Sequence, residues 1–396
     1  MAEKEFNASE FFQKYTMIIA LVLVVIVFAL MTEGKNLTPR SINNLIAQNG
    51  YVFVLAAGML LCILTGGNID LSVGSVICFS AAVGCVLMDK GINMWIAVFA
   101  MLAIGLAIGA FQGFWIAKLH VPAFIATLSG MYAFRGFSNV VLNGFRVDVR
   151  DTAFLNLFGG GADCYIPDFL QGKTAIVAGE LNLTCLAIGL VATLIFILMK
   201  VRKILIQKKL NIHQSIPGQI VTMAIISAVT VWMTWKLAND KGFPTVLIWI
   251  GLVLGIYQYI TTKAAIGRHL YAVGGNEKAT ALSGVKTRNV YWFAYASIGL
   301  MAGLGGILTA ARGVGIDPTV GEGYEMDAIA SCFIGGASAY GGIGKVSGMI
   351  VGAVLMGVIN QGMNMVSVDS NYQKVVKGLV LLVAVIFDVL SKRQKR

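Results

Sequence analysis

The most constraining feature of this chain is a series of twelve apolar runs separated by short polar loops. A helix of about 20 apolar residues spans the hydrocarbon core of a bilayer. The runs cover residues 17–31, 42–64, 73–88, 94–117, 121–142, 181–199, 216–236, 245–262, 290–311, 326–340, 346–366 and 375–390. The pattern predicts an all-α polytopic membrane protein with about 10–12 transmembrane segments, some of them short or broken.

The composition excludes a soluble globular protein. Of the 396 residues, 57% are hydrophobic and only 12% are charged, about half the roughly 25% of an ordinary soluble domain. The 46 glycines favour a helical bundle over a barrel, because small residues let the backbones of transmembrane helices approach closely.

The positions of the basic residues predict the orientation in the membrane. The net charge is +11, from 30 Lys and Arg against 19 Asp and Glu. With the N-terminus inside, 18 of the 30 basic residues fall in inner segments, 11 in outer segments and one, Arg135, within an apolar run. Cytoplasmic loops carry an excess of Lys and Arg, so we expect both termini in the cytoplasm. We expect these basic residues to contact the headgroups of membrane lipids, and we expect no nucleic-acid partner.

The sequence predicts a single transmembrane domain over residues 1–396. No low-complexity linker tethers a second domain, and five of the six cysteines lie inside apolar runs, where we expect core packing and no disulfides. The first apolar run has no cleavage signature and is expected to be a retained helix. We expect cytoplasmic tails at 1–15 and 391–396, an outer loop at 144–180 and a cytoplasmic coupling loop at 263–289.

Chemistry by the chain itself is not expected. The nearest approach to a phosphate loop is PDFLQGKT, in which Pro167 replaces the required first glycine. His120, His213 and His269 lie far apart, and no HExxH or GxSxG pattern is present. We therefore predict no catalytic residues, no metal site and no cofactor.

The cytoplasmic loop contains a predicted short helix over residues 277–283. Gly274 and Gly275 are expected to break the chain, Asn276 to cap the helix, and Gly284 to end it. Two turns are too short to be stable alone in water, so the helix needs a partner surface. Two alternatives are open, which are a cleft in a cytoplasmic protein and the surface of its own bundle.

Two Gly-rich stretches interrupt apolar runs, TGGNIDLSVGS at 65–75 and GGASAYGGIG at 335–344. Breaks at membrane depth are tolerated where the backbone is buried in protein or lines a wet cavity. Paired broken segments indicate a translocation path, and tight helix packing alone would also use these glycines. The residues predicted along the path are Asn68, Asp70, Ser72, Gly74, Glu325, Asp327, Gly335 and Gly336.

The ionisable residues at or near the spans need an explanation, because a charge is expensive in lipid. We favour a capping role for Asp70 at the start of the helix after Ser72. Glu325 and Asp327 lie near the N-terminal end of a short helix, where the dipole favours acids, so they are structural or face the outer mouth. Arg135 is expected to pair with an acid or to bond the carbonyl groups of a broken helix.

The loop sequence GRHLYAVGGNEKATALSGV and both Gly-rich stretches, the second extended to GYEMDAIASCFIGGASAYGGIGKVSG, occur in an order that resembles a known family. That family is the permease subunits of bacterial ATP-binding-cassette importers for monosaccharides, and the resemblance covers residues 43–388. The chain departs from the family pattern at Thr280 and Ala281. The resemblance implies that the loop docks on an ATPase subunit through Gly274, Gly275, Asn276, Glu277, Ala279, Leu282, Ser283 and Gly284.

The resemblance further implies a multi-pass protein of the bacterial inner membrane. It would work as a homodimer with two ATPase subunits and a periplasmic or lipid-anchored sugar-binding protein. Its substrate would be a pentose or aldohexose such as xylose, arabinose, galactose or glucose, as in the xylose-type and multiple-sugar branch. The alternatives are a branched-chain amino acid permease of the same superfamily and an ion-coupled secondary transporter.

Overall fold

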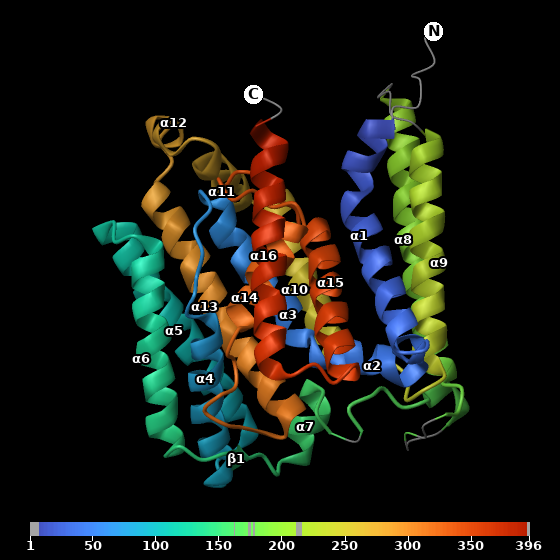
Figure 1. Ribbon diagram of the computed structural model, residues 1–396, viewed down its shortest axis with the longest axis horizontal. Helices are drawn as coiled ribbons and strands as arrows, with labels where there is room; N and C mark the ends of the chain where they lie inside the picture. Colours follow the sequence, from blue (N-terminus) through green and yellow to red (C-terminus); the bar gives the residue numbers. More distant parts are fainter. Residues whose placement is uncertain (1–7, 162, 173–175, 177–178, 211–215, 394–396) are drawn as a thin grey trace.

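The chain forms a bundle of helices in a computed structural model that describes residues 8–161, 163–172, 176, 179–210 and 216–393 (Figure 1). The long helices are α1 (Ala8–Met31), α3 (Gly50–Leu64), α4 (Val73–Asp89), α5 (Met94–Leu119), α6 (Ala123–Leu142), α8 (Leu183–Lys209), α9 (Ile216–Ala238), α10 (Val246–Thr262), α13 (Thr287–Gly313), α15 (Val346–Met365) and α16 (Ser370–Arg393). The short elements are α2 (Pro39–Gln48), α7 (Thr152–Phe158), α11 (Ala265–Gly275), α12 (Glu277–Leu282), α14 (Tyr324–Ile334), two 3-10 turns (Lys35–Leu37, Phe169–Gln171), β1 (Val147–Asp148) and β2 (Gly315–Ile316).

The prediction of an all-α membrane protein is confirmed. Within the described part of the chain five helices, namely α5, α8, α9 from Gly218, α13 and α15, are each long and apolar enough to cross a membrane. Two bent pairs, α2 with α3 and α10 with α11, raise this number to seven, and Met17–Met31 and Val73–Asp89 are shorter apolar helices. The count of 10–12 crossings stays a prediction.

Helix α13 lies at the centre of the bundle and packs most closely on α5. Gly105 and Gly109 of α5 face Gly299 and Gly303 of α13. A methyl group at Gly109 would lie 2.7 Å from the Gly299 Cα, so side chains larger than hydrogen are excluded from this crossing. Two GxxxG segments thus let the helix backbones touch, which accounts for part of the high glycine content.

Helices α8 and α9 lie at one side of the bundle together with α1 (Figure 1). Only 17% of the most apolar window of α8 and 11% of that of α9 is buried within the chain, against 78% for α13. The two helices pack chiefly on each other. Their apolar surfaces suit contact with lipid.

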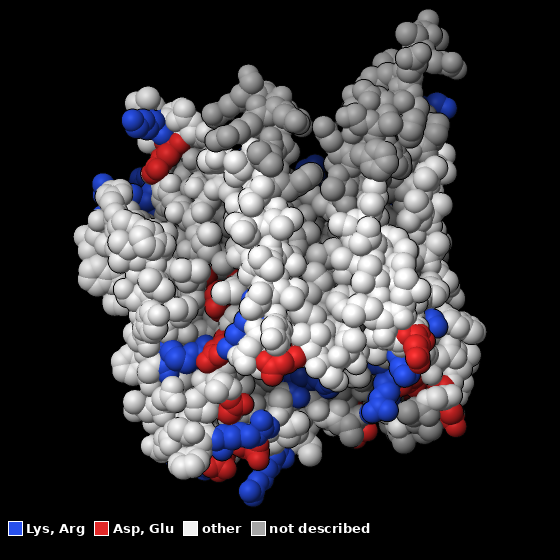
Figure 2. All heavy atoms as spheres, in the orientation of Figure 1, with Lys and Arg blue, Asp and Glu red and all other residues white. Residues whose placement is uncertain are grey.

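The two ends of the bundle differ in structure. The start of α1, the end of α16 and α12 lie at one end, and β1 and α7 lie at the other (Figure 1). At the latter end β1 pairs antiparallel with β2, with Val147 opposite Ile316. Charged residues gather at the β1 and α7 end and around α12, and the described surface between them is mostly uncharged (Figure 2). This distribution is the one that a bilayer requires.

Some elements extend beyond or fall short of the apolar runs. Helix α1 begins at Ala8, before the apolar run at residue 17, and residues 1–7 of the predicted tail lie outside the described part. The cytoplasmic tail at 1–15 stays a prediction. Cys164, which the sequence placed in a polar loop, is as buried as the other five cysteines. The run at 326–340 is helical only to Ile334, because Gly335 and Gly336 end α14.

Candidate functional site

Helix α12 forms where the sequence predicts it. The side-chain oxygen of Asn276 accepts a hydrogen bond from the Ala279 N–H over 3.0 Å, which caps the helix. Glu277 occupies the first turn. Gly284 follows the end of the helix with φ +88°, a left-handed conformation that glycine adopts without strain. The predicted cap and stop are therefore confirmed.

One side of α12 rests on the bundle and the other side faces away from it. Thr280 is buried, whereas the Leu282 side chain is 90% exposed. The Tyr291 hydroxyl of α13 donates to the Glu277 carboxylate over 3.0 Å. Helix α12 is thus fastened to α13 and presents an apolar side chain outward. The surface of its own bundle therefore covers only the Thr280 side of α12, and the Leu282 side is left open.

Gly274 and Gly275 do not break the chain as predicted. They form the last turn of α11, and the break comes at Asn276, which is extended. A side chain at Gly274 would overlap the Leu64 carbonyl oxygen and would lie 3.0 Å from the Gly342 Cα. A side chain at Gly275 would meet nothing within 4 Å. Gly274 therefore packs inside the protein, and of the two only Gly275 is open to a partner.

The backbone of Gly274 contacts two other segments, so that all three stretches of the family resemblance meet at one place. We name this contact the glycine junction. It comprises Gly274, residues 64–67 at the end of α3 and residues 339–342 after α14. The Gly342 N–H donates to the Leu64 carbonyl oxygen over 3.0 Å. A side chain at Gly341 would overlap Gly66, and one at Gly67 would overlap the Ala339 carbonyl. The two Gly-rich breaks thus touch each other and the end of α11.

Among the residues predicted along the path, Asp70 and Ser72 form the turn that leads into α4. The Asp70 carboxylate accepts hydrogen bonds from the Ser72 N–H and hydroxyl over 2.8 and 2.7 Å. Gln112 of α5 donates to the Ser72 hydroxyl over 2.9 Å. All three side chains are buried. Asp70 thus fixes the turn before α4, but it bonds Ser72 at the N-cap position, and in the described chain no side chain accepts a hydrogen bond from the first turn of the helix itself. Asn68 lies in the same break and bonds back to Thr65.

Gly74 and Glu325 lie beside the segment between β2 and α14. A side chain at Gly74 would overlap the Gly321 carbonyl and would meet the Glu325 carboxylate. Arg135 donates to the carbonyl oxygens of Pro318 and Val320 over 2.9 and 2.6 Å. Arg135 thus bonds carbonyl groups, as in the second of the two expected alternatives, but these groups belong to the loop before α14 and not to a broken helix.

Gly335 and Gly336 support the packing alternative. Gly335 lies against the backbone of Gly348 and Met349 in α15. A side-chain carbon added at Gly335 would lie only 2.6 Å from the Met349 Cα. Gly336 has φ +83°. Gly335 lies at the contact of α14 with α15, and a side chain at Gly336 would meet the Met17 side chain of α1. The part of both glycines in translocation stays a prediction.

Asp327 joins a buried polar network that the sequence does not reveal. Its side chain is fully buried and forms an ion pair with Lys377 of α16 over 2.9 Å. The same carboxylate oxygen accepts hydrogen bonds from the Tyr51 hydroxyl over 2.7 Å and from the Asn360 amide over 3.3 Å. Four helices, α3, α14, α15 and α16, thus meet at one carboxylate.

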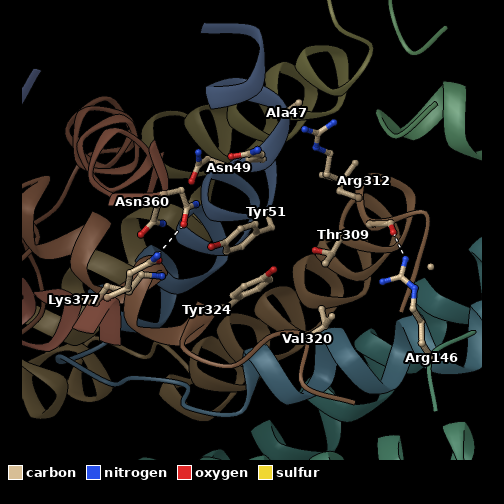
Figure 3. A pocket seen from close by; sticks show the side chains of 16 residues that line it. Ala47, Asn49, Tyr51, Arg146, Thr309, Arg312, Val320, Tyr324, Asn360 and Lys377 are labelled. Carbon is tan, nitrogen blue, oxygen red and sulfur yellow. Dashed lines mark hydrogen bonds between the residues drawn. The ribbon is translucent and has the colours of Figure 1, made fainter. Parts of the chain in front are cut away.

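The network adjoins a cavity of about 330 Å³ at the end of the bundle opposite α12 (Figure 3). Tyr51 and Tyr324 stack with ring centroids 3.7 Å apart beside it. The signals in the sequence were Asp327 at the start of a short apolar run and Asn360 and Lys377 within apolar runs. The lining residues are Ala47, Gln48, Asn49, Tyr51, Arg146, Leu308, Thr309, Arg312, Gly313, Gly315, Val320, Tyr324, Asn360, Asn364, Gln373 and Lys377.

Comparison with known proteins identifies the family. The model of the family described as branched-chain amino acid transport system / permease component matches residues 41–385. The xylose transport system permease protein XylH of Escherichia coli (strain K12) is 33% identical over 96% of this chain and 93% of its own length. The ribose import permease protein RbsC of the same strain is 32% identical over 98% of this chain and 97% of its own length.

No solved structure is significantly similar to the chain. The family match covers both breaks, the cytoplasmic loop and every helix from α3 to α15. This chain therefore belongs to the family of branched-chain amino acid transport system permease components.

Proposed function

We propose that the chain is the permease subunit of an ATP-binding-cassette importer that carries a monosaccharide across the bacterial inner membrane. The substrate is a pentose or an aldohexose such as xylose, arabinose, galactose or glucose. The relatives XylH and RbsC, named for xylose and ribose, match almost the whole chain. The structural observation that carries the proposal is α12, a capped helix with an exposed Leu282 next to the glycine junction.

In this proposal a separate ATPase subunit hydrolyses ATP and docks on α12. Leu282 and Ala279 would enter a cleft of the ATPase, and the Asn276 cap and Gly284 would hold the helix in shape. Closure of the ATPase dimer would push α12 and, through Tyr291 and the glycine junction, rock the bundle from an inward-open to an outward-open state. Glu277 links α12 to α13 by accepting the hydrogen bond from the Tyr291 hydroxyl, so a displacement of α12 reaches α13.

The remaining partners follow from the same proposal. Two copies of the chain form a homodimer with two ATPase subunits, and a periplasmic or lipid-anchored binding protein delivers the sugar. Both termini lie in the cytoplasm, which agrees with the position of the start of α1 and the end of α16 at the α12 end of the bundle (Figure 1). The outer segment at 144–180 then faces the binding protein.

The test is reconstitution of the chain into liposomes with the ATPase subunit and the binding protein of its own transport system. We expect uptake of labelled xylose or ribose that requires ATP and all three components. Uptake by the chain alone, without ATP, would contradict the proposal and favour an ion-coupled transporter. The family description keeps a branched-chain amino acid as the second candidate substrate, and labelled leucine is the matching probe.

A further inference from the structure

The cavity beside Asp327 has features of a binding site for a solute in transit. Its volume of about 330 Å³ lies within the range of about 300–1,000 Å³ of small-molecule sites. In Figure 3 Tyr51, Thr309, Tyr324 and Asn360 surround one opening. Helices α2, α3, α13, α14, α15 and α16 all contribute to its walls.

The lining is rich in groups that exchange hydrogen bonds with hydroxyl groups. The carboxamides are Gln48, Asn49, Asn360, Asn364 and Gln373, and the hydroxyls are Tyr51, Thr309 and Tyr324. A carboxamide both donates and accepts hydrogen bonds, as each hydroxyl of a sugar does. The set matches a polyhydroxylated solute.

Two buried polar atoms at this cavity have no partner among the described residues. They are the Thr309 hydroxyl oxygen and the Asn360 side-chain oxygen. Asn360 is only 8% exposed. Buried polar atoms in folded proteins are hydrogen-bonded with few exceptions, so these two indicate a ligand that the cavity receives.

The charges at the cavity favour a neutral solute. Lys377 is paired with Asp327, Arg146 bonds Asp148 and the Gly313 carbonyl, and Arg312 contacts Asn44 over 3.4 Å. The described lining contains no Asp or Glu, and the neighbouring Asp327 carboxylate is already paired with Lys377. The ammonium group of an amino acid would therefore have to compete with Lys377 for that carboxylate, whereas an uncharged sugar needs none.

We propose that this cavity within a single protomer is a transit subsite for a neutral monosaccharide of pentose or hexose size, bound through Thr309, Asn360 and the neighbouring carboxamides. The inference rests on the proposed importer function and adds the site and its selectivity. It places one sugar site in each copy of the chain.

The first test is protection from a thiol reagent in the reconstituted importer. Gln48→Cys places a thiol at an exposed lining position, and Asn371→Cys is the matched control, exposed on α16 but outside the lining. The six native cysteines are buried, so their background is low. Millimolar xylose or ribose is expected to slow the labelling of Gln48→Cys several-fold and to leave the labelling rate of Asn371→Cys unchanged. Leucine is expected to slow the labelling of neither variant.

The second test uses the unpartnered hydroxyl. Thr309→Val keeps the shape and removes a group that bonds nothing in the described chain, so the thermal stability is expected to stay equal or to rise. Sugar uptake is expected to fall several-fold through a higher KM for sugar delivery, and Thr309→Ser, which keeps the hydroxyl, is expected to restore it.

Each outcome has a separate meaning. An importer that transports xylose or ribose, yet shows neither protection nor an effect of Thr309→Val, overturns the transit subsite and leaves the proposed function standing. Protection by leucine instead of the sugars overturns the selectivity together with the proposed substrate. Protection by a sugar, with Asn371→Cys unaffected, supports the subsite.

Discussion

The Gly342 N–H donates a hydrogen bond to the Leu64 carbonyl oxygen over 3.0 Å, which ties the break after α14 to the end of α3. Gly274 at the end of α11 lies against both residues. The loop at 263–289 therefore reaches the two broken segments directly, through main-chain atoms.

This contact predicts opposite outcomes for two neighbouring glycines. Gly274→Ala would force a methyl group onto the Leu64 carbonyl, and overpacking of this kind costs about 1–3 kcal/mol. Gly275→Ala adds a methyl group in open space and favours the helix. We expect Gly274→Ala to lower the melting temperature in detergent and to reduce sugar uptake, with Gly275→Ala close to wild type. Equal behaviour of both variants would contradict the packing assigned to Gly274.

The exposed Leu282 separates docking from folding. Because its side chain is 90% exposed, Leu282→Ser is expected to leave thermal stability unchanged and to abolish co-purification of the ATPase subunit. Leu282→Met keeps the apolar contact and should retain the partner. Full retention of the ATPase by Leu282→Ser would exclude this residue from the docking surface.

The cap of α12 is measurable by hydrogen exchange. Asn276→Ala removes the acceptor for the Ala279 N–H, a loss of about 1 kcal/mol for a helix of only six residues. We expect faster amide exchange over residues 277–283 and weaker stimulation of ATP hydrolysis by the binding protein. Asn276→Asp retains the acceptor and serves as control, and slow exchange in Asn276→Ala would show that the bundle alone holds the helix.

The ion pair between Asp327 and Lys377 predicts strong non-additivity. Lys377→Met leaves a fully buried carboxylate without its cation, which costs about 3–5 kcal/mol. Asp327→Asn combined with Lys377→Met removes both charges, and we expect this double variant to melt well above Lys377→Met alone. Thermal unfolding of the two single variants, Asp327→Asn and Lys377→Met, and of the double variant gives the coupling energy, and a double variant no more stable than Lys377→Met would argue against a direct pair.

The segment around Asp168 is predicted to lose stability at acid pH. Burial raises the pKa of the Asp168 carboxyl, but hydrogen bonds from Leu183, Thr184 and Gln171 outweigh it and lower the pKa below its usual range. A lowered folded pKa stabilises the fold above the ordinary value of about 3.9, and this contribution is lost as the pH falls from there through the folded pKa.

Limited proteolysis of the outer segment between Phe169 and Thr184 at stepwise lower pH is the measurement. Cleavage is expected to increase below about pH 4 in the wild-type chain. Asp168→Asn has no charge to lose, so it should be cleaved more readily at neutral pH and respond less to acid. A pH response identical to that of the wild type would contradict the assignment to Asp168.

The helices and α12 could be predicted because their signals are local. Apolar runs mark the helices, and Asn276 with Gly284 marks both ends of α12. The glycine junction and the cavity could not be predicted, because they depend on contacts between distant segments. Tyr51, Asp327, Asn360 and Lys377 lie in four helices, and nothing in their neighbouring residues shows that they meet. Gly274 was placed at a break because a glycine pair has the same local signature in a turn and in a tightly packed helix end.

The glycine junction also determines how motion can pass through the protein. Where side chains separate two segments, a small displacement is absorbed by rotation about side-chain bonds. At Gly274, Leu64 and Gly342 no side chain lies between the backbones, so this slack is missing. A shift of α11 is therefore expected to move the end of α3 and the segment after α14 by a similar distance. A displacement at the α12 end of the bundle is transmitted to the two breaks with little loss.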